Sequence, residues 1–267
     1  MSAPADTPWP TEDRPGGDED TGSRPALTRR SHPDLMVWAG HLAERRRCPR
    51  QHGNRIALGI ASPDPAPVTA ATTRGLLTHR ELQERHDRWE AHGAVALACE
   101  APDHHVEAVQ ADVRAHLDLC PAEDGARYLA GEQVLVTRLE DLGAVVLAIV
   151  DAVWEHADGT IELRDYKTGA APPGPAEDPA ALVHALLART HWPEHPSRVT
   201  YELLADAPTT AELPVTQDTV EAALGAVGEH VAALRRGEWE ARPGPHCRWC
   251  DYRRSCPSSQ AAAADPS

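Results

Sequence analysis

Residues 144–169 read AVVLAIVDAVWEHADGTIELRDYKTG, and they predict the centre of the sheet. Two runs rich in Val, Ile and Leu, 144–154 and 160–167, stand on either side of Asp158-Gly159. Asp-Gly between apolar runs is a strong signal for a tight β-hairpin turn. The stretch therefore predicts two antiparallel strands joined by a two-residue turn.

Three charged residues of this hairpin are candidates for chemistry. Asp151 lies in the first run, and Asp165 and Lys167 end the second. Strand side chains alternate, so Asp165 and Lys167 share a face. Charges among apolar residues are costly unless they are paired, solvated or bound to a cation. A salt bridge to Lys167 is one explanation. The other is phosphodiester hydrolysis, in which carboxylates hold Mg²⁺ or Mn²⁺ and the lysine orients a water.

Lys167 is the only lysine among the 26 Lys and Arg residues of the chain, and phenylalanine is absent. This bias indicates that arginine replaced lysine wherever a generic positive charge sufficed. Lysine differs from arginine because its compact ammonium contacts a single oxygen and can exchange a proton. Lys167 is therefore a candidate for a specific role, the alternative being chance retention on the surface.

The rest of the chain alternates between helical and strand patterns. Apolar residues at helical spacing predict helices, and Gly237 is expected to end the last of them. The predicted helices cover 35–47, 73–89, 106–117, 178–190 and 220–234, and further strands are expected at 132–139, 199–204 and near 212. These elements predict an α/β domain with a mixed central sheet flanked by helices.

The composition indicates a globular protein with polar ends. We expect residues 1–32 to be a disordered arm, 33–257 to form one folded domain, and 258–267 to be a disordered tail. The chain contains no apolar stretch long enough for a membrane span or a secretory signal, which predicts a cytoplasmic protein. Its formal net charge of -15 excludes a uniformly basic nucleic-acid-coating surface, so any DNA contact is expected to be local.

Four of the six cysteines form a recognisable set. Cys247, Cys250 and Cys256 have the spacing C-x2-C-x5-C, and Cys48 lies at the end of the first predicted helix. Four thiolates fit either an iron-sulfur cluster or tetrahedral zinc, and a shared metal would close the C-terminus onto the N-terminal helix. Cys99 and Cys120 fall outside the pattern and are predicted to be small core residues.

Arginines gather around both parts of this cysteine set. If the two parts meet, the arginines form a basic patch for DNA phosphates, with aromatic residues for base stacking. Pairing of the arginines with acidic helices is the alternative. The residues predicted to bind DNA are Arg45, Arg46, Arg47, Arg50, Arg248, Arg253, Arg254, Trp249 and Tyr252, and Arg235, Arg236 and Arg242 lie near them in sequence.

Asp151 followed by D-Y-K-T-G at 165–169 resembles the PD-(D/E)XK nuclease superfamily and its RecB-like branch. Residues 74–79, RGLLTH, resemble the G-x-x-x-H element of that branch, although a histidine alone is more often a surface or capping residue. The resemblance covers most of residues 35–256 and implies a restriction-endonuclease-like fold. It also implies that His79, Asp151, Asp165 and the Tyr166 backbone carbonyl bind Mg²⁺ or Mn²⁺ while Lys167 orients the attacking water. Glu132 and Glu140 are weaker candidates for a further ligand.

The cysteine spacing resembles RecB-like nucleases of the AddB type and CRISPR-associated adaptation exonucleases. That likeness implies a [4Fe-4S] cluster on Cys48, Cys247, Cys250 and Cys256, with structural Zn²⁺ as the alternative. It further implies an exonuclease that prefers single-stranded DNA in repair, recombination or CRISPR adaptation. The single lysine leaves no Walker-type G-x-x-x-x-G-K-[ST] motif, so we expect any unwinding to come from a helicase or other complex partner.

Two departures from the family pattern keep other functions open. Ala148 stands where a glycine is common, and the predicted helix DPAALVHALLART at 178–190 lacks the Q-x-x-x-Y found in many relatives. One alternative is therefore a DNA-binding subunit of a repair complex with weak or no catalysis. Another is a zinc-stabilised regulator without catalysis.

Overall fold

The computed structural model describes residues 34–63, 68–92, 106–169, 174–204 and 207–259. The predicted arm at 1–32, Cys99 and residues 260–267 of the predicted tail lie outside these ranges. The first two residues of that tail, Ser258 and Ser259, are described, and Ser259 is buried.

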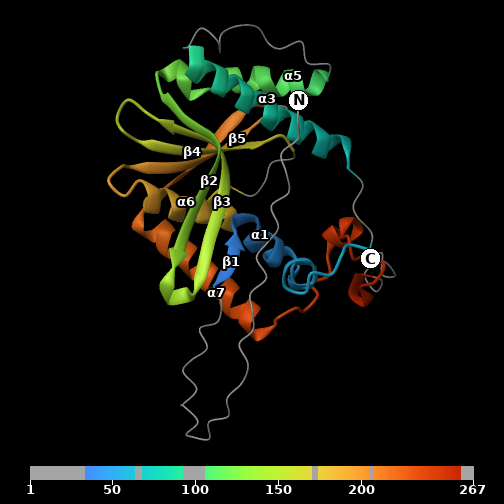
Figure 1. Cartoon of the computed structure of the whole chain (residues 1–267). Helices are drawn as coiled ribbons and strands as arrows, with labels where there is room; N and C mark the ends of the chain where they lie inside the picture. The colour runs from blue at the N-terminus through green and yellow to red at the C-terminus, as the bar shows by residue number, and fades with distance from the viewer. Residues whose placement is uncertain (1–33, 64–67, 93–105, 170–173, 205–206, 260–267) are drawn as a thin grey trace, which may run out of the picture. The chain divides into compact units, whose positions relative to one another are not determined.

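A mixed six-stranded sheet forms the centre of the domain, as predicted (Figure 1). Its longest pairing joins β2 and β3 in antiparallel fashion, and β4 and β5 are parallel while β5 and β6 are antiparallel. The strands are β1 (Leu35–Trp38), β2 (Arg127–Leu139), β3 (Ala144–Glu155), β4 (Ile161–Lys167), β5 (Ser197–Leu203) and β6 (Thr209–Pro214).

A fork opens in the sheet beside β3. Along its length, one side of β3 pairs with β2. On the other side, β1 pairs in parallel as far as Leu147 and β4 pairs antiparallel only from Ala152 onward. Within the described residues, 148–151 thus have no strand neighbour on that side. Residues 165–167 of β4 pair with β5 but not with β3, so Asp151 and the end of β4 border the same fork.

Helices cover both faces of the sheet. They are α1 (Ala39–Arg47), α2 (Pro49–His52), a π-helical turn at Gly53–Ala57, α3 (Ala70–His92), α5 (Glu107–Leu117), α6 (Pro179–His191) and α7 (Gln217–Arg236), with short 3-10 turns at Pro121–Asp124, Glu140–Leu142 and Pro245–Trp249. Residues of α1, α6 and α7 pack in one apolar cluster with the sheet. Residues of α3 and α5 pack in a second cluster with β2, β3 and β4.

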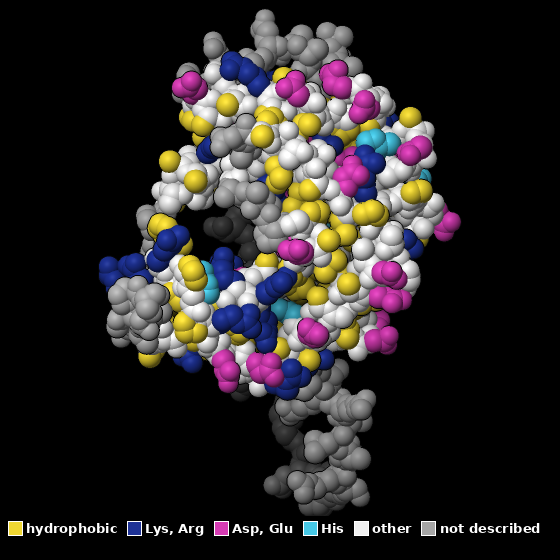
Figure 2. All heavy atoms as spheres, turned by 180° about the vertical axis from the view of Figure 1, so that it is seen from behind, with side chains coloured by type: hydrophobic (Ala, Val, Ile, Leu, Met, Phe, Trp, Pro, Cys, Tyr) yellow, Lys and Arg dark blue, Asp and Glu magenta, His cyan; other side chains and the backbone are white. Residues whose placement is uncertain are grey.

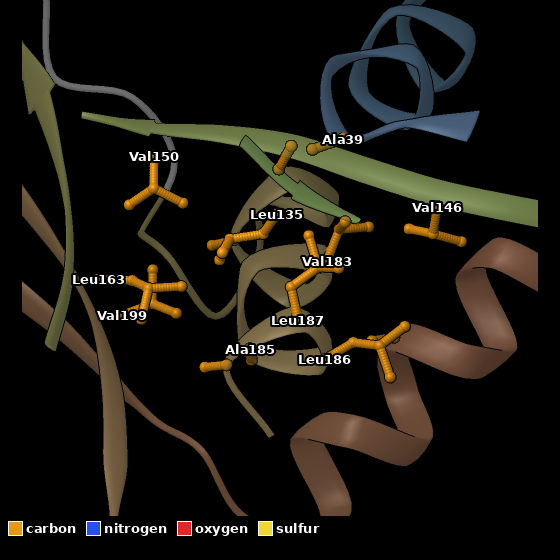
Figure 3. Packing of buried hydrophobic residues seen from close by; sticks show 14 of the residues in the cluster. Ala39, Leu135, Val146, Val150, Leu163, Val183, Ala185, Leu186, Leu187 and Val199 are labelled. Atoms are coloured by element: carbon orange, nitrogen blue, oxygen red, sulfur yellow. The ribbon is translucent and has the colours of Figure 1, made fainter. Parts of the chain in front are cut away.

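The larger cluster lies between α6 and the sheet. Figure 3 shows Val183 and Leu187 of α6 facing Leu135 and Val150 of the strands. Each fully buried aliphatic side chain contributes about 1.5–3 kcal/mol relative to exposure. Rigid packing of this kind fixes β3 and β4, which carry the charged residues of the hairpin.

Two local predictions are corrected. Leu35–Trp38 form a strand rather than the start of a helix, because they pair with the exposed edge of β3, and the helix begins at Ala39. The hairpin turn is longer than two residues, since His156 N donates to Thr160 O and Gly159 N donates to His156 O, both at 2.9 Å. Gly159 has φ 81°, the left-handed conformation that a three-residue loop requires.

The helix ends follow the sequence signals closely. Asp178 caps α6 by accepting a hydrogen bond from Ala180 N at 2.9 Å, and Gly237 ends α7 with φ 66° as predicted. Between the predicted helices 35–47 and 73–89, where no element was predicted, the structure contains α2, the π-helical turn and the start of α3.

Candidate active site

Three potential metal ligands converge at the fork. His79 comes from α3, Glu132 from β2 and Asp151 from β3, and one ligand atom of each lies within 4.8 Å of the other two. Glu132 has φ 45° and is the one described non-glycine residue with positive φ. A residue held in this costly conformation is a sign of a functional constraint. The structure thus makes Glu132, a weaker candidate in the sequence, a full member of the group.

Asp151 connects the two sides of the fork. Its Oδ1 lies 3.2 Å from His79 Nδ1, and its Oδ2 accepts a hydrogen bond from the backbone N of Tyr166 at 2.7 Å. Burial acts to raise the pKa of Asp151, but the contacts with His79 and the Tyr166 N–H together hold it below its ordinary value. Asp151 is therefore an anion aimed at the fork.

Asp165 and Lys167 form an ion pair beside this anion, with Lys167 Nζ donating to Asp165 Oδ2 at 2.8 Å. Burial and the negative charge of Asp151 raise the pKa of Asp165 to about 6, against the opposing effect of Lys167. Two neighbouring carboxylates repel each other when both are ionised. A bound cation would relieve this repulsion.

Lys167 also contacts an aromatic ring, which was not predicted from the sequence. Lys167 Nζ sits 4.5 Å from the ring centroid of Tyr201, and the Tyr201 hydroxyl donates to Asp178 Oδ2 at 2.8 Å. Tyr201 is the β5 neighbour of Asp165. Tyr201 and Asp178 therefore fix the position of Lys167 from β5 and the start of α6, and only the sheet register brings them there.

His184 of α6 is the second residue that sequence reasoning missed. It is buried, and burial followed by the nearby positive charge of Lys167 lowers its pKa to about 4. His184 is therefore neutral near pH 7. It occupies the helix in which the Q-x-x-x-Y pattern is absent, so this helix still supplies a polar residue near the lysine.

Glu140 does not join the site. It begins a 3-10 turn after β2, and its carboxylate lies 3.3 Å from Arg138 Nη1. Eight residues of extended chain separate it from Glu132, about 26 Å at strand spacing.

The four predicted cluster cysteines line one cavity. Cys48 is buried, whereas Cys247, Cys250 and Cys256 are partly exposed. Burial, with smaller contributions from the other three cysteines, raises the pKa of Cys250, as expected for neighbouring thiols. Among the described residues, no three of these four sulfur atoms all lie within 4.8 Å of one another.

The two arginine clusters meet around a cavity of about 750 Å³ lined by Arg45, Arg46, Arg236 and Arg242. Part of their charge is compensated, because Arg45 and Arg236 contact Glu238 at 3.3 and 2.6 Å. Figure 2 shows basic side chains gathered in one region of the surface with acidic side chains beside them. Some of these arginines are therefore paired with acidic side chains, and a basic surface remains beside them.

The remaining predicted DNA contacts differ in exposure. Trp249 is 67% exposed, with Arg248 Cζ 5.1 Å from its ring centroid, and is available for stacking. Tyr252 is only 3% exposed, and its hydroxyl donates to Ile60 O at 2.8 Å. Its ring is therefore not available for the base stacking that was predicted. Of the arginines around the cysteine set, Arg45 is half-buried, and the exposed ones are Arg46, Arg47, Arg50, Arg235, Arg236, Arg242, Arg248, Arg253 and Arg254.

Among the described residues, no helix is both long and apolar enough to cross a membrane.

Comparison with known proteins gives one extensive match. The sequence profile of the PD-(D/E)XK nuclease superfamily matches residues 39–257. No curated protein matches the chain. Similar solved structures include SSO0001, with 12% identity, a TM-score of 0.41 and coverage of 85% of this chain and 88% of that one. Another is a "Putative exonuclease" from Eubacterium rectale, with 11% identity, a TM-score of 0.49 and coverage of 81% and 87%.

Proposed function

Because this chain belongs to the PD-(D/E)XK nuclease superfamily, we propose that it is a deoxyribonuclease that depends on Mg²⁺ or Mn²⁺ and acts at the fork beside β3. The observation that carries this proposal is the convergence of His79, Glu132 and Asp151 within 4.8 Å, next to the Lys167–Asp165 pair. A salt bridge alone does not explain this arrangement, because Glu132, Asp151 and Asp165 bring three carboxylates to a site with one lysine and one histidine.

The donor set fits a hard divalent cation. Carboxylate oxygens and one imidazole nitrogen suit Mg²⁺ and Mn²⁺. His79, Glu132 and Asp151 would hold the ion, joined by Asp165 and the Tyr166 carbonyl at the end of β4. When bound, such an ion polarises a phosphoryl oxygen and lowers the pKa of a coordinated water. The raised pKa of Asp165 is consistent with a site that gains from an added positive charge.

Lys167 acts on the attacking water. Its ammonium is held between Asp165 and the ring of Tyr201 and remains 28% exposed on its side chain. A compact ammonium held in this way orients one oxygen atom, whereas the forked guanidinium of an arginine would span two. Binding of the other DNA phosphates is assigned to the arginines.

DNA contact falls to the surface formed by the two arginine clusters. The cavity between α1, α7 and the segment after α7 offers guanidinium groups for phosphates, and Trp249 offers an exposed ring for a base. Within the described residues, the buried Nε of Arg45 has no hydrogen-bond partner. The family resemblance supports three further parts of the proposal. They are a preference for single strands, exonucleolytic cleavage, and a place in repair, recombination or CRISPR adaptation with a helicase-type partner.

A nuclease assay with Mn²⁺ tests this proposal. End-labelled linear single strands, duplexes and closed single-stranded circles are incubated with the wild type, Lys167→Ala, Asp165→Asn and the control Glu140→Gln. We expect the first two variants to lose at least about 100-fold in rate and the control to retain full activity. Cleavage of linear strands but not of circles supports an exonuclease. Equal activity in all four proteins would refute the site.

The same assay addresses the main alternative, a DNA-binding subunit without catalysis. That reading requires a wild type that binds single strands with salt-dependent affinity and cleaves none of the substrates. The contact of Tyr201 with Lys167 favours catalysis, because it holds the lysine in place although the helix α6 lacks the Q-x-x-x-Y residues.

We propose further that Cys48, Cys247, Cys250 and Cys256 hold a [4Fe-4S] cluster that closes the C-terminal segment onto the end of α1. All four line one cavity, which supports a shared metal group. Tetrahedral zinc has Zn–S bonds of about 2.3 Å and would bring the sulfurs to about 3.8 Å from one another. Every set of three among these sulfurs contains a pair more than 4.8 Å apart, which supports a larger cluster over zinc.

Anaerobic purification tests the cluster. We expect a brown protein with about four iron atoms per chain that turns colourless when Cys250 is changed to Ser. A colourless protein without iron, with zinc bound to four sulfurs, would overturn the cluster and leave the nuclease proposal untouched.

A further inference from the structure

A second group of metal-ligand side chains lies in the apolar cluster beneath α3 and α5. His86 comes from α3, His116 from α5, and Cys120 follows α5 directly. One ligand atom of each lies within 4.8 Å of the other two, and the two Nε2 atoms are 3.1 Å apart. All three side chains are buried, and both histidines are 0% exposed. As predicted, Cys120 is a core residue.

The two facing nitrogens restrict what can lie between them. Two imidazole lone pairs repel each other at this distance, so either a proton or a metal ion lies between them. His116 Nδ1 lies 2.7 Å from Glu202 Oε1 and donates to that carboxylate, so the Nε2 lone pair of His116 can accept a proton from His86 or bind a metal ion.

We propose that His86, His116 and Cys120 form a buried zinc site that fastens α3 and α5 to the sheet. Two imidazoles and a thiolate are a donor set that selects Zn²⁺ over Mg²⁺. Zn–N bonds of about 2.0–2.1 Å place two nitrogens about 3.3 Å apart in a tetrahedron, close to the spacing found here. Glu202 supplies the carboxylate that orients a zinc-bound histidine through its other ring nitrogen.

Zinc binding adds a charge that Glu202 can compensate. Zn²⁺ displaces the thiol proton of Cys120 to solvent, and the thiolate reduces the two positive charges of the ion to one. The carboxylate of Glu202, 2.7 Å from His116 Nδ1, faces this charge and also accepts a hydrogen bond from Arg164 Nη1 at 2.6 Å.

Another buried polar side chain packs against the two histidines. The ring of Tyr166 lies 5.4 Å from that of His116, and Tyr166 is 2% exposed. Its hydroxyl has no hydrogen-bond partner within the described part of the chain.

The site would position the active-site helix without touching the reaction. His79 and His86 both lie on α3, seven residues and about 10 Å apart along its axis. Zinc at His86 would thus hold the helix that presents His79 at the fork. This inference does not depend on the nuclease proposal.

Zinc analysis of protein from zinc-supplemented cells tests the inference, with the wild type, Cys120→Ser, His86→Gln and the control Cys250→Ser. We expect about one zinc per chain in the wild type and the control, and at least about tenfold less in the other two. Zinc X-ray absorption on the wild type should show nitrogen together with a single sulfur, which distinguishes this site from the four-cysteine cavity and from the sulfur-free fork.

The zinc X-ray absorption spectrum tests the inference even if a variant fails to fold, because it needs only the wild type. Three outcomes would overturn the inference: wild type without zinc, equal zinc in wild type and a folded Cys120→Ser, or a shell of sulfur alone or without sulfur.

Discussion

The ring and the hydroxyl of Tyr201 make separable contacts. The ring centroid lies 4.5 Å from Lys167 Nζ, and the hydroxyl donates to Asp178 at 2.8 Å. Tyr201→Phe keeps the ring and removes the hydrogen bond, whereas Tyr201→Leu removes both. If the ring positions Lys167, only the second change should reduce the rate of cleavage strongly.

The expected magnitudes follow from these contacts. A cation over an aromatic ring gains about 0.5–2 kcal/mol, and about 1 kcal/mol is reasonable for a side chain as exposed as Lys167. Loss of that interaction in the transition state lowers kcat about fivefold. The hydrogen bond contributes about 1 kcal/mol to stability, so Tyr201→Phe should unfold at lower urea concentration with kcat within about twofold of wild type.

The assay measures kcat and KM on labelled single-stranded DNA with Mn²⁺, with circular dichroism confirming a native protein at the assay temperature. Tyr128→Leu is the matched control, because Tyr128 is also buried and donates to a carboxylate, Asp87, but its ring packs on His86 and Trp154. A loss in Tyr201→Phe equal to that in Tyr201→Leu would refute the role of the ring. An equal loss in Tyr128→Leu would show general destabilisation instead.

Three further predictions follow from the same geometry. Glu132→Gln should raise the Mn²⁺ concentration for half-maximal cleavage at least about tenfold, and an unchanged metal titration would exclude Glu132 as a ligand. Burial opposes ionisation of Glu162, but Arg164 and Arg198 lower its pKa from 4.5 to about 2, so its stabilisation is present above pH 4.5 and is lost as the pH falls toward 2. Glu162→Gln should therefore cost about 3 kcal/mol in urea unfolding at pH 7 and less at pH 3, and a cost independent of pH would contradict the linkage. Trp249→Ala should weaken binding of single-stranded DNA by about 1–3 kcal/mol in fluorescence anisotropy without changing stability, and unchanged affinity would remove Trp249 from the DNA path.

Much of the architecture was readable from local patterns. The apolar runs of β3 and β4, the helical spacing of α5 and α7, and Gly237 at the end of α7 all occur where the sequence placed them. These patterns are visible because periodicity and turn chemistry act over a few neighbouring residues. Leu35–Trp38 were misassigned because four residues are too short to show a period, and their strand depends on the free edge of β3.

The motif residues were likewise visible as a set, since Asp165 and Lys167 lie two residues apart on the same face of one strand and Asp151 lies on the adjacent strand. Tyr201 and His184 were not, because their meeting with Lys167 depends on the parallel register of β5 and on the packing of α6. Glu132 and Glu140 looked alike in sequence and were separated only by the course of β2.

The sequence by itself therefore determined the elements of this protein, the hairpin that carries its charges and the family to which it belongs, since all three are written in short-range spacing. The tertiary structure decided which groups meet: the fork that exposes Asp151, the ring beneath Lys167, and the pairing of His86 with His116 and Cys120. The physical reason is that metal binding and pKa shifts depend on distances of a few ångströms between residues remote in sequence, and only packing sets those distances.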